Sequence, residues 1–183
     1  MDPELAKGKF LIAMPTLLDP NFRQAIILLC EHGPDGSLGL VLNRPTNVEV
    51  STLIEDLPEL AASGQVYAGG PVGKNGMLIL CRGDATSEDR GILKDVFLAH
   101  DLDVLKFPWL YESAGEIRCF VGYAGWATGQ LEAEVNAGAW HILAADSKLI
   151  FDANPATLWQ EMMLQIGGEC AIYASMPQDL SLN

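Results

Sequence analysis

The chain has 183 residues, of which 49% are hydrophobic and 19% are charged. A chain of this length suits one domain with a sizeable core, and its composition excludes the disordered, collagenous and highly charged classes of protein. Its 11 lysines and arginines stand against 24 aspartates and glutamates, which gives a net charge of −13. Direct binding to nucleic acid is therefore not expected, because no positive charge is left over to displace counterions from phosphate.

No signal for export or membrane insertion is expected in this sequence. The segment Met1–Glu4 is acidic, whereas a signal peptide begins with a basic region. Apolar runs such as Ala25–Cys30 are far shorter than the roughly 20 residues that cross a bilayer. We therefore predict a cytoplasmic protein that makes no use of a membrane.

The first half of the chain is predicted to form short buried strands joined by turns. Two apolar runs, 25–31 and 38–42, flank the turn-forming cluster 32–36 and so predict an antiparallel hairpin. Ser51 is a candidate N-cap, and Pro58 a candidate stop, for one short helix. The predicted elements are strands over 10–13, 25–31, 38–42, 66–68 and 77–81 and a helix over 50–57.

The second half adds the clearest helix. It starts at Asn154 and Pro155, because asparagine caps a helix and proline suits its first turn. Leu158, Met162 and Ile166 then fall on one helical face. The predicted elements are strands over 96–98, 116–122, 140–144 and 171–174, a helical turn over 101–107, helices over 128–136 and 154–166, and a frayed end beyond Pro177.

Strands and helices do not alternate regularly along this chain, as they would in a doubly wound fold. The antiparallel hairpin near the start also argues against a parallel sheet. These features favour an α+β fold with a mixed sheet and three or four short helices, in a single domain over residues 1–183.

Four cysteines, Cys30, Cys81, Cys119 and Cys170, lie in or beside apolar runs. A zinc site made of four cysteines normally shows close pairs, and a disulfide framework is unusual in a chain this long with so few cysteines. We interpret these residues as reduced core thiols. A redox or metal role assembled in space is the alternative.

Two glycine-rich segments stand out. Residues 68–75 imitate a phosphate-binding loop, but Ala68 replaces its first glycine and Asn75 replaces the hydroxyl residue that holds Mg²⁺. We interpret 69–73 as a tight glycine turn between two strands. Residues 122–132 are predicted to join a strand to a helix as a packed turn with Trp126 in the core, and a ligand or partner surface is the alternative.

The segment Asn43–Pro45 places an arginine directly after a buried strand. Arg44 could bind a carboxylate or phosphate, or it could bridge to a nearby aspartate or glutamate. Elsewhere, neither the HExxH pattern nor the GxSxG pattern occurs, and His100–Asp103 is more simply the acidic first turn of a helix. No catalytic residue, metal site or cofactor is therefore predicted.

Several motifs occur in an order that resembles the bacterial AlgH/YqgE family, a group of small proteins of uncharacterised biochemistry. Each motif is weak alone, but the ordered set is specific and spans residues 8–172. The residues that carry the resemblance are Gly8–Pro15, Phe22, Gly39–Pro45, Gly69–Val72, Gly122–Trp126, Gly129–Glu132, Glu134 and Trp140.

The resemblance implies a compact α+β domain with a mixed, partly barrel-like sheet in the bacterial cytosol. It also implies a regulatory role, because members of the family are described as transcriptional regulators, and it supplies no catalytic residues. Since the chain is strongly acidic and lacks a helix-turn-helix pattern, we expect any such regulation to act through a protein partner or a ligand.

The three segments at strand ends and glycine turns are predicted to converge on one recognition surface. Arg44 would orient an acidic group from a ligand or from Glu132; alternatively, each turn only closes its own pair of strands. The leading hypothesis is a non-enzymatic regulatory or binding protein that recognises an unknown protein partner or a small anionic ligand. The alternative is a small-anion binder or an enzyme that uses the same loops. The predicted binding residues are Asn43, Arg44, Gly69, Gly70, Gly122, Tyr123, Gly125, Trp126, Gln130 and Glu132.

Overall fold

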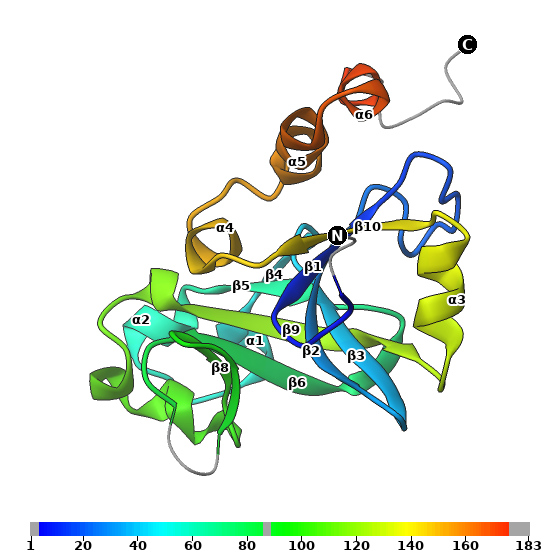
Figure 1. Cartoon of the computed structure of the whole chain (residues 1–183). Coiled ribbons are helices and arrows are strands. Elements are labelled where there is room, and N and C mark those ends of the chain that lie inside the picture. The colour runs from blue at the N-terminus through cyan, green and yellow to red at the C-terminus, as the bar shows by residue number, and fades with distance from the viewer. Residues whose placement is uncertain (1–3, 86–88, 176–183) are drawn as a thin grey trace.

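Ten strands form one continuous sheet in the computed structural model of the protein, which describes residues 4–85 and 89–175 (Figure 1). The strands are β1 (Lys9–Ala13), β2 (Ile26–Gly33), β3 (Gly36–Val41), β4 (Pro45–Glu49), β5 (Gln65–Ala68), β6 (Val72–Arg82), β7 (Arg90–Leu93), β8 (Val96–Leu98), β9 (Ile117–Trp126) and β10 (Trp140–Ala144). The α-helices are α1 (Val50–Leu53), α2 (Glu59–Ala62), α3 (Gln130–Asn136), α4 (Ser147–Phe151), α5 (Leu158–Ile166) and α6 (Glu169–Tyr173). Three 3₁₀ turns are η1 (Leu102–Lys106), η2 (Pro108–Leu110) and η3 (Ala114–Glu116).

The sheet is mixed and open. Its main path runs β10-β1-β2-β3-β9-β6-β8-β7, and the two end strands do not pair with each other in the described part of the chain. β5 runs parallel to β9 and pairs on its other edge with β4, while every other described pairing is antiparallel. The predicted α+β class with a mixed sheet is confirmed. The sheet is not closed into a barrel, and the described residues form six α-helices rather than three or four.

Strand β9 organises the sheet because it pairs with three other strands. One of its edges pairs with β6 from Ile117 to Tyr123. Its other edge pairs first with β5 and then, from Ala124 to Trp126, with β3. The change of partner falls at Gly122, so this residue stands where the two halves of the sheet join.

Backbone segments pack directly against one another at this junction, which we call the glycine crossing (Gly69, Gly70 and Gly122). The Gly69 N–H donates to the Val121 carbonyl at 2.9 Å, and the Gly69 carbonyl accepts from the Val41 N–H at 2.9 Å. A Cβ atom on Gly70 would overlap the backbone of Tyr123, and one on Gly122 would overlap the Gly70 carbonyl. Gly122 also has a φ of +76°, a conformation that glycine adopts readily. No side chain fits at this crossing.

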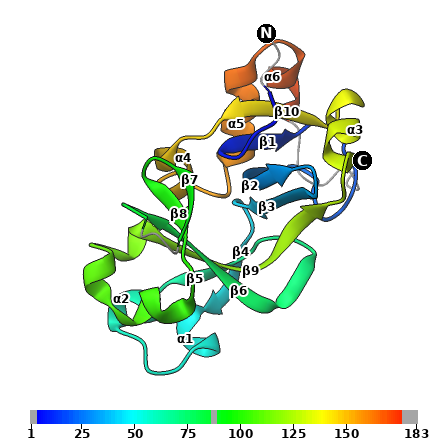
Figure 2. The same ribbon diagram turned by 60° about the horizontal axis from the view of Figure 1, so that its bottom comes forward.

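Helices cover both faces of the strands (Figure 2). On one face α4 and α5 contribute Phe151 and Trp159, which pack with strand residues such as Phe120. On the opposite face of β5, β6 and β9, the covering elements α1 and η1 contribute Val50 and Leu105. Neighbouring residues in β6 and β9 alternate between these two clusters, as expected for strands buried on both sides.

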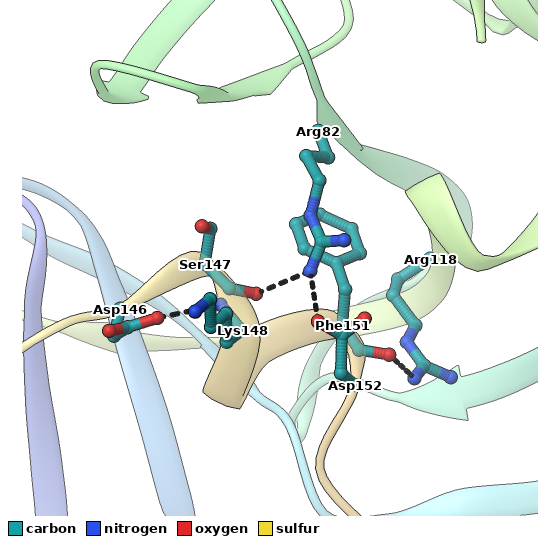
Figure 3. A network of polar contacts seen from close by, with 7 residues as sticks. All are labelled: Arg82, Arg118, Asp146, Ser147, Lys148, Phe151 and Asp152. Atoms are coloured by element: carbon teal, nitrogen blue, oxygen red, sulfur yellow. Dashed lines mark hydrogen bonds and ion pairs between the residues drawn. The ribbon is translucent and has the colours of Figure 1, made fainter. Parts of the chain in front are cut away.

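Two arginines hold α4 against the sheet, as Figure 3 shows. Arg118 of β9 donates to the Phe151 carbonyl at 2.6 Å and to the Tyr67 hydroxyl. Arg82 of β6 donates to the Ser147 carbonyl at 3.1 Å and to a carboxylate oxygen of Asp152 at 2.8 Å. The carbonyl groups of a short helix are therefore satisfied by side chains that arrive from distant strands.

The structure corrects several sequence-based predictions. Residues 122–126 continue strand β9, although they were expected to form a turn. Residues 171–174 were predicted as a strand, but α6 covers Glu169–Tyr173 and packs beside α5. A short apolar run does not distinguish a buried helix from a strand, and no neighbouring strand is available there among the described residues. The predicted frayed end beyond Pro177 lies outside the described residues.

Replacing Gly122 with alanine should lower the free energy of unfolding by at least about 3 kcal/mol, because the new methyl group adds steric overlap to an unfavourable φ. Gly129 provides a matched control: its φ is +74°, but a Cβ there meets no atom within 4 Å. Gly129→Ala should cost only about 1 kcal/mol. Urea unfolding of both variants tests this difference, and equal losses would show that the crossing is not tightly packed.

Candidate functional site

The three predicted segments meet through their backbones, but their side chains face different hollows. The Ala68 N–H donates to the Arg44 carbonyl at 2.9 Å, which joins the first segment to the second, and the glycine crossing joins the second to the third. Arg44, Gly70 and Tyr123 nevertheless line three separate hollows. The backbones of the three segments therefore meet, but their side chains line different hollows among the described residues, and their shared recognition surface stays a prediction.

Asn43 is buried and links the end of β3 to the chain before β2. Its amide oxygen accepts from the Ile26 N–H at 2.9 Å, and its amide nitrogen donates to the Gln24 carbonyl at 2.8 Å. Both halves of the amide are thus engaged by backbone. Asn43 positions the neighbouring residue rather than presenting a free group to solvent.

The neighbouring Arg44 is a half-buried cation. Its guanidinium donates to the Asn43 carbonyl at 3.2 Å and to the Arg23 carbonyl. Burial lowers the pKa of this guanidinium below its ordinary value, because removal from water disfavours the charged form. Among the described residues, no carboxylate pairs with Arg44, so neither the bridge to an acidic residue nor the contact with Glu132 is formed.

The Arg44 side chain lies in an open hollow of about 450 Å³, which we call the arginine groove. Two arginines and two amides line it, and none of its eight described lining residues is acidic. Gln24 is one of two described non-glycine residues with a positive φ, at +54°. The lining residues are Pro20, Arg23, Gln24, Asn43, Arg44, Pro45, Pro155 and Ala156.

The residues predicted from the third segment occupy the end of β9 and the start of α3. Tyr123, Gly125 and Trp126 line an open hollow of about 430 Å³ together with Val72 of β6. Gln130 accepts from the Ala127 N–H at 3.0 Å and so supports the start of α3. These residues shape the surface, and their role in binding stays a prediction.

The predicted residue Glu132 faces His32, with 3.9 Å between its carboxylate and the His32 Nε2 atom. Glu134, two residues further on, was not predicted to have a function, yet it connects two buried aromatic residues. One of its carboxylate oxygens accepts from the indole N–H groups of Trp126 at 2.9 Å and Trp140 at 2.8 Å. The other accepts from the Gln130 amide at 3.0 Å. The spacing of Gln130 and Glu134 by four residues on a helix was the available signal.

A cleft of about 620 Å³ lies on the α1 side of the sheet, and sequence reasoning missed most of its lining. Gly70 belongs to it, but its other walls come from β4, α1, β5, β9 and the η1 turn. Residues 73–76 interrupt the pairing of β6 with β9 and bulge beside it, since Val72 pairs with Tyr123 and Met77 with Val121. The bulge explains why this glycine-rich segment is not a simple turn between two strands.

Three of the four cysteines are buried in the core, and Cys170 is partly buried. All four cysteines are free, and burial raises the pKa of Cys81 and of Cys119 to about 12, so both remain protonated at neutral pH. The described residues include no group of three or more histidine, cysteine, aspartate or glutamate side chains arranged to hold a metal ion. In the same part of the chain, no helix is both long and apolar enough to cross a membrane.

Glu134→Ala should lower the free energy of unfolding by about 2–5 kcal/mol, because two indole N–H groups lose their acceptor in a largely buried setting. Glu134→Gln keeps an acceptor and should lose less. Glu132→Ala is the control on the same helix and should change stability little, since its contact with His32 is long and partly exposed. Urea unfolding followed by tryptophan fluorescence measures all three, and similar values for Glu132→Ala and Glu134→Ala would contradict the assigned role.

Comparison with known sequences identifies relatives along nearly the whole chain. A family model described as AlgH-like matches residues 10–171. A UPF0301 protein of Streptomyces coelicolor is 40% identical, with 96% of this chain and 94% of that protein covered. A UPF0301 protein of Chlorobium luteolum is 36% identical, with 98% and 95% covered.

Two solved structures are also similar. The crystal structure of protein DIP2367 from Corynebacterium diphtheriae has a TM-score of 0.80 over 96% of this chain and 95% of that one, and at 20% identity it supports the fold alone. The solution structure of the AlgH protein from Pseudomonas aeruginosa has a TM-score of 0.72 at 30% identity, over 97% and 98% of the two chains. With a matching family model, relatives of this identity and a shared fold, the chain belongs to the AlgH-like family.

Proposed function

We propose that the protein is a regulatory binding protein that recognises the acidic group of a small ligand in the arginine groove. One observation carries this proposal: in a chain with a net charge of −13, the half-buried guanidinium of Arg44 lies in a hollow that has no acidic residue among its described lining. An anion would be attracted to this part of the surface and repelled by most of the rest.

The hydrogen bonds of Arg44 suit it to this role. Two main-chain carbonyls, of Asn43 and Arg23, each accept from one of its terminal nitrogens and fix the plane of the guanidinium. A guanidinium has five N–H groups, so further donors remain for a ligand. Carboxylates and phosphates match this planar fork, and such charge-assisted hydrogen bonds are stronger than neutral ones.

The surroundings of Arg44 support the same conclusion. Carbonyl oxygens do not neutralise a full positive charge, and burial keeps water from screening it completely. Gln24 has a positive φ, its carbonyl accepts from the Asn43 amide, and the residue lines the groove. Strained backbone of this kind is often found at ligand sites.

The groove also suggests how a ligand could regulate the protein. Its lining comes from the segment before β2, from the start of β4 and from Pro155 and Ala156 before α5. A bound anion would bridge these three parts of the chain and stabilise the surface they form. A protein partner that recognises this surface would then respond to the ligand, which is how an acidic protein could influence transcription without touching DNA.

The proposal is tested by calorimetric titration with inorganic phosphate and with succinate, which separate phosphate from carboxylate recognition. We expect at least one probe to bind and Arg44→Gln to weaken that binding about tenfold or more, as expected for loss of a charge-assisted hydrogen bond. Arg44→Lys should weaken it less, because it keeps the charge but not the fork.

Arg90→Gln is the matched control, since Arg90 is exposed and pairs with Glu31 away from the groove. Circular dichroism should show folded protein for every variant. The proposal is wrong if neither probe binds at millimolar concentration, or if Arg44→Gln and Arg90→Gln have equal effects. Unfolding of Arg44→Gln alone, with unchanged binding in folded Arg44→Lys, would instead indicate a structural role for Arg44.

A further inference from the structure

The cleft on the α1 side of the sheet is mainly apolar, unlike the arginine groove. Its floor is the apolar face of β5 and β9, where Val66 and Val121 lie, and Ile54 and Leu53 of the α1 region form one wall. Leu53 is 50% exposed although it is apolar. Val66 is only 2% exposed, so the accessible apolar surface of the cleft comes mainly from Leu53 and from Val48 of β4.

The cleft has few polar side chains: those of its described lining are Thr46, Tyr67, Lys74 and Asn75. Thr46 is already engaged, because its hydroxyl donates to the Val66 carbonyl at 2.7 Å and accepts from the Val48 N–H at 3.1 Å. Lys74 and Asn75 come from the bulge in β6 and are both exposed. Lys74 is the only lysine, arginine, histidine, aspartate or glutamate in the described lining, and the one other titratable residue there is Tyr67.

The Tyr67 hydroxyl is engaged on the other face of the sheet. It accepts a hydrogen bond from Arg118, which belongs to the face of the sheet that carries α4. The polarity of the cleft is consequently simple, with an apolar floor and wall and a single cation at the edge. Lys74 is thus one of only 11 lysines and arginines in an acidic chain, and it lines a cleft of ligand size with partly exposed apolar walls.

We propose that this cleft binds a small amphipathic carboxylic acid, with its hydrocarbon part on Val48, Val121 and Leu53 and its carboxylate at Lys74. Charge complementarity selects an acid over an amine, because the lining offers a cation and no carboxylate among the described residues. The hydrocarbon part gains by leaving water, in proportion to the apolar area it covers. A cleft of about 620 Å³ accommodates a chain of medium length.

Under this proposal, the bulge at residues 73–76 of β6 places Lys74 beside the ligand. A regular β6 would pair along all of β9, whereas the four residues 73–76 bow out and carry Lys74 beside the cleft. Gly73, with a φ of +66°, permits this shape, and a Cβ there would meet the Tyr123 ring. The segment that superficially imitates a phosphate-binding loop thus presents one cation to an apolar cleft.

The test uses the whole protein with decanoate and, as the neutral probe of similar length, decanol, each below the concentration at which it aggregates. Amide shifts in ¹⁵N-labelled protein locate the site, and titration gives the affinity. We expect decanoate to cause saturable shifts of the protein amides of residues 73–76 and Val121. Lys74→Gln should lower the affinity for decanoate about three- to fivefold, as for loss of an exposed ion pair. Lys74→Arg should retain decanoate binding, and decanol binding should not change in either variant.

Lys94→Gln is the control, because Lys94 is also exposed but lies in the turn between β7 and β8. Leu53→Asn tests the apolar wall and should weaken both probes. Binding should be unaffected by Arg44→Gln, so this proposal and the arginine groove can fail separately. Absence of saturable decanoate binding, shifts elsewhere on the surface, or equal effects of Lys74→Gln and Lys94→Gln would each overturn the proposal.

Discussion

The contact between two backbone segments at the glycine crossing is the constraint on which the rest of the structure depends. Gly69 and Gly70 pass so close to Gly122 that a side chain on Gly70 or Gly122 would displace a main-chain atom. This approach allows β9 to exchange β5 for β3 along a single edge, and thereby joins two parts of the sheet. The core cluster beneath α4 and α5 extends across both parts, from Leu28 of β2 to Leu80 of β6 and Phe120 of β9.

The same crossing explains how the family motifs divide between architecture and recognition. Their glycines bring backbones together, while the side chains beside them are directed to different surfaces. Both ends of the Asn43 amide form hydrogen bonds with backbone groups, which hold the chain next to Arg44 in place. Glu134 likewise supports Trp126 and Trp140 from within. Arg44 and Lys74 differ from these residues, because each presents charge to a hollow without an acidic residue in its described lining.

Much of the fold could be predicted from local patterns, and the failures share a cause. Continuous apolar runs identified β1, β2, β3 and β10, since such runs are long enough to specify buried strands. Helix α4 was not predicted, because five residues are too few to show an amphipathic pattern. It is stabilised instead by Arg82 and Arg118, which donate to its carbonyl groups from distant strands. The turn expected at 122–126 became part of β9, since pairing with β3 and β6 is set by register across the sheet rather than by the glycines themselves.

The candidate site shows the same limit. The position of Arg44 after a buried strand marked it as a functional candidate, but its hydrogen-bond partner Arg23 lies 21 residues away in sequence. The expected contact with Glu132 did not form, because α3 turns that carboxylate toward His32. In the sequence, Lys74 stood out only as part of an incomplete phosphate-loop pattern. Its significance depends on a bulge in β6 and on a cleft lined by several distant elements, neither of which a single segment encodes.

Native-state hydrogen exchange tests the central role of the glycine crossing most directly. The amide hydrogens of Gly69 and Val41 form the hydrogen bonds that join β3, the crossing and β9. If the crossing holds the two parts of the sheet together, these amides should exchange only through global unfolding, with a free energy equal to that from denaturant. Exchange through local opening, at a free energy close to that of the exposed Val48 amide in β4, would contradict the account.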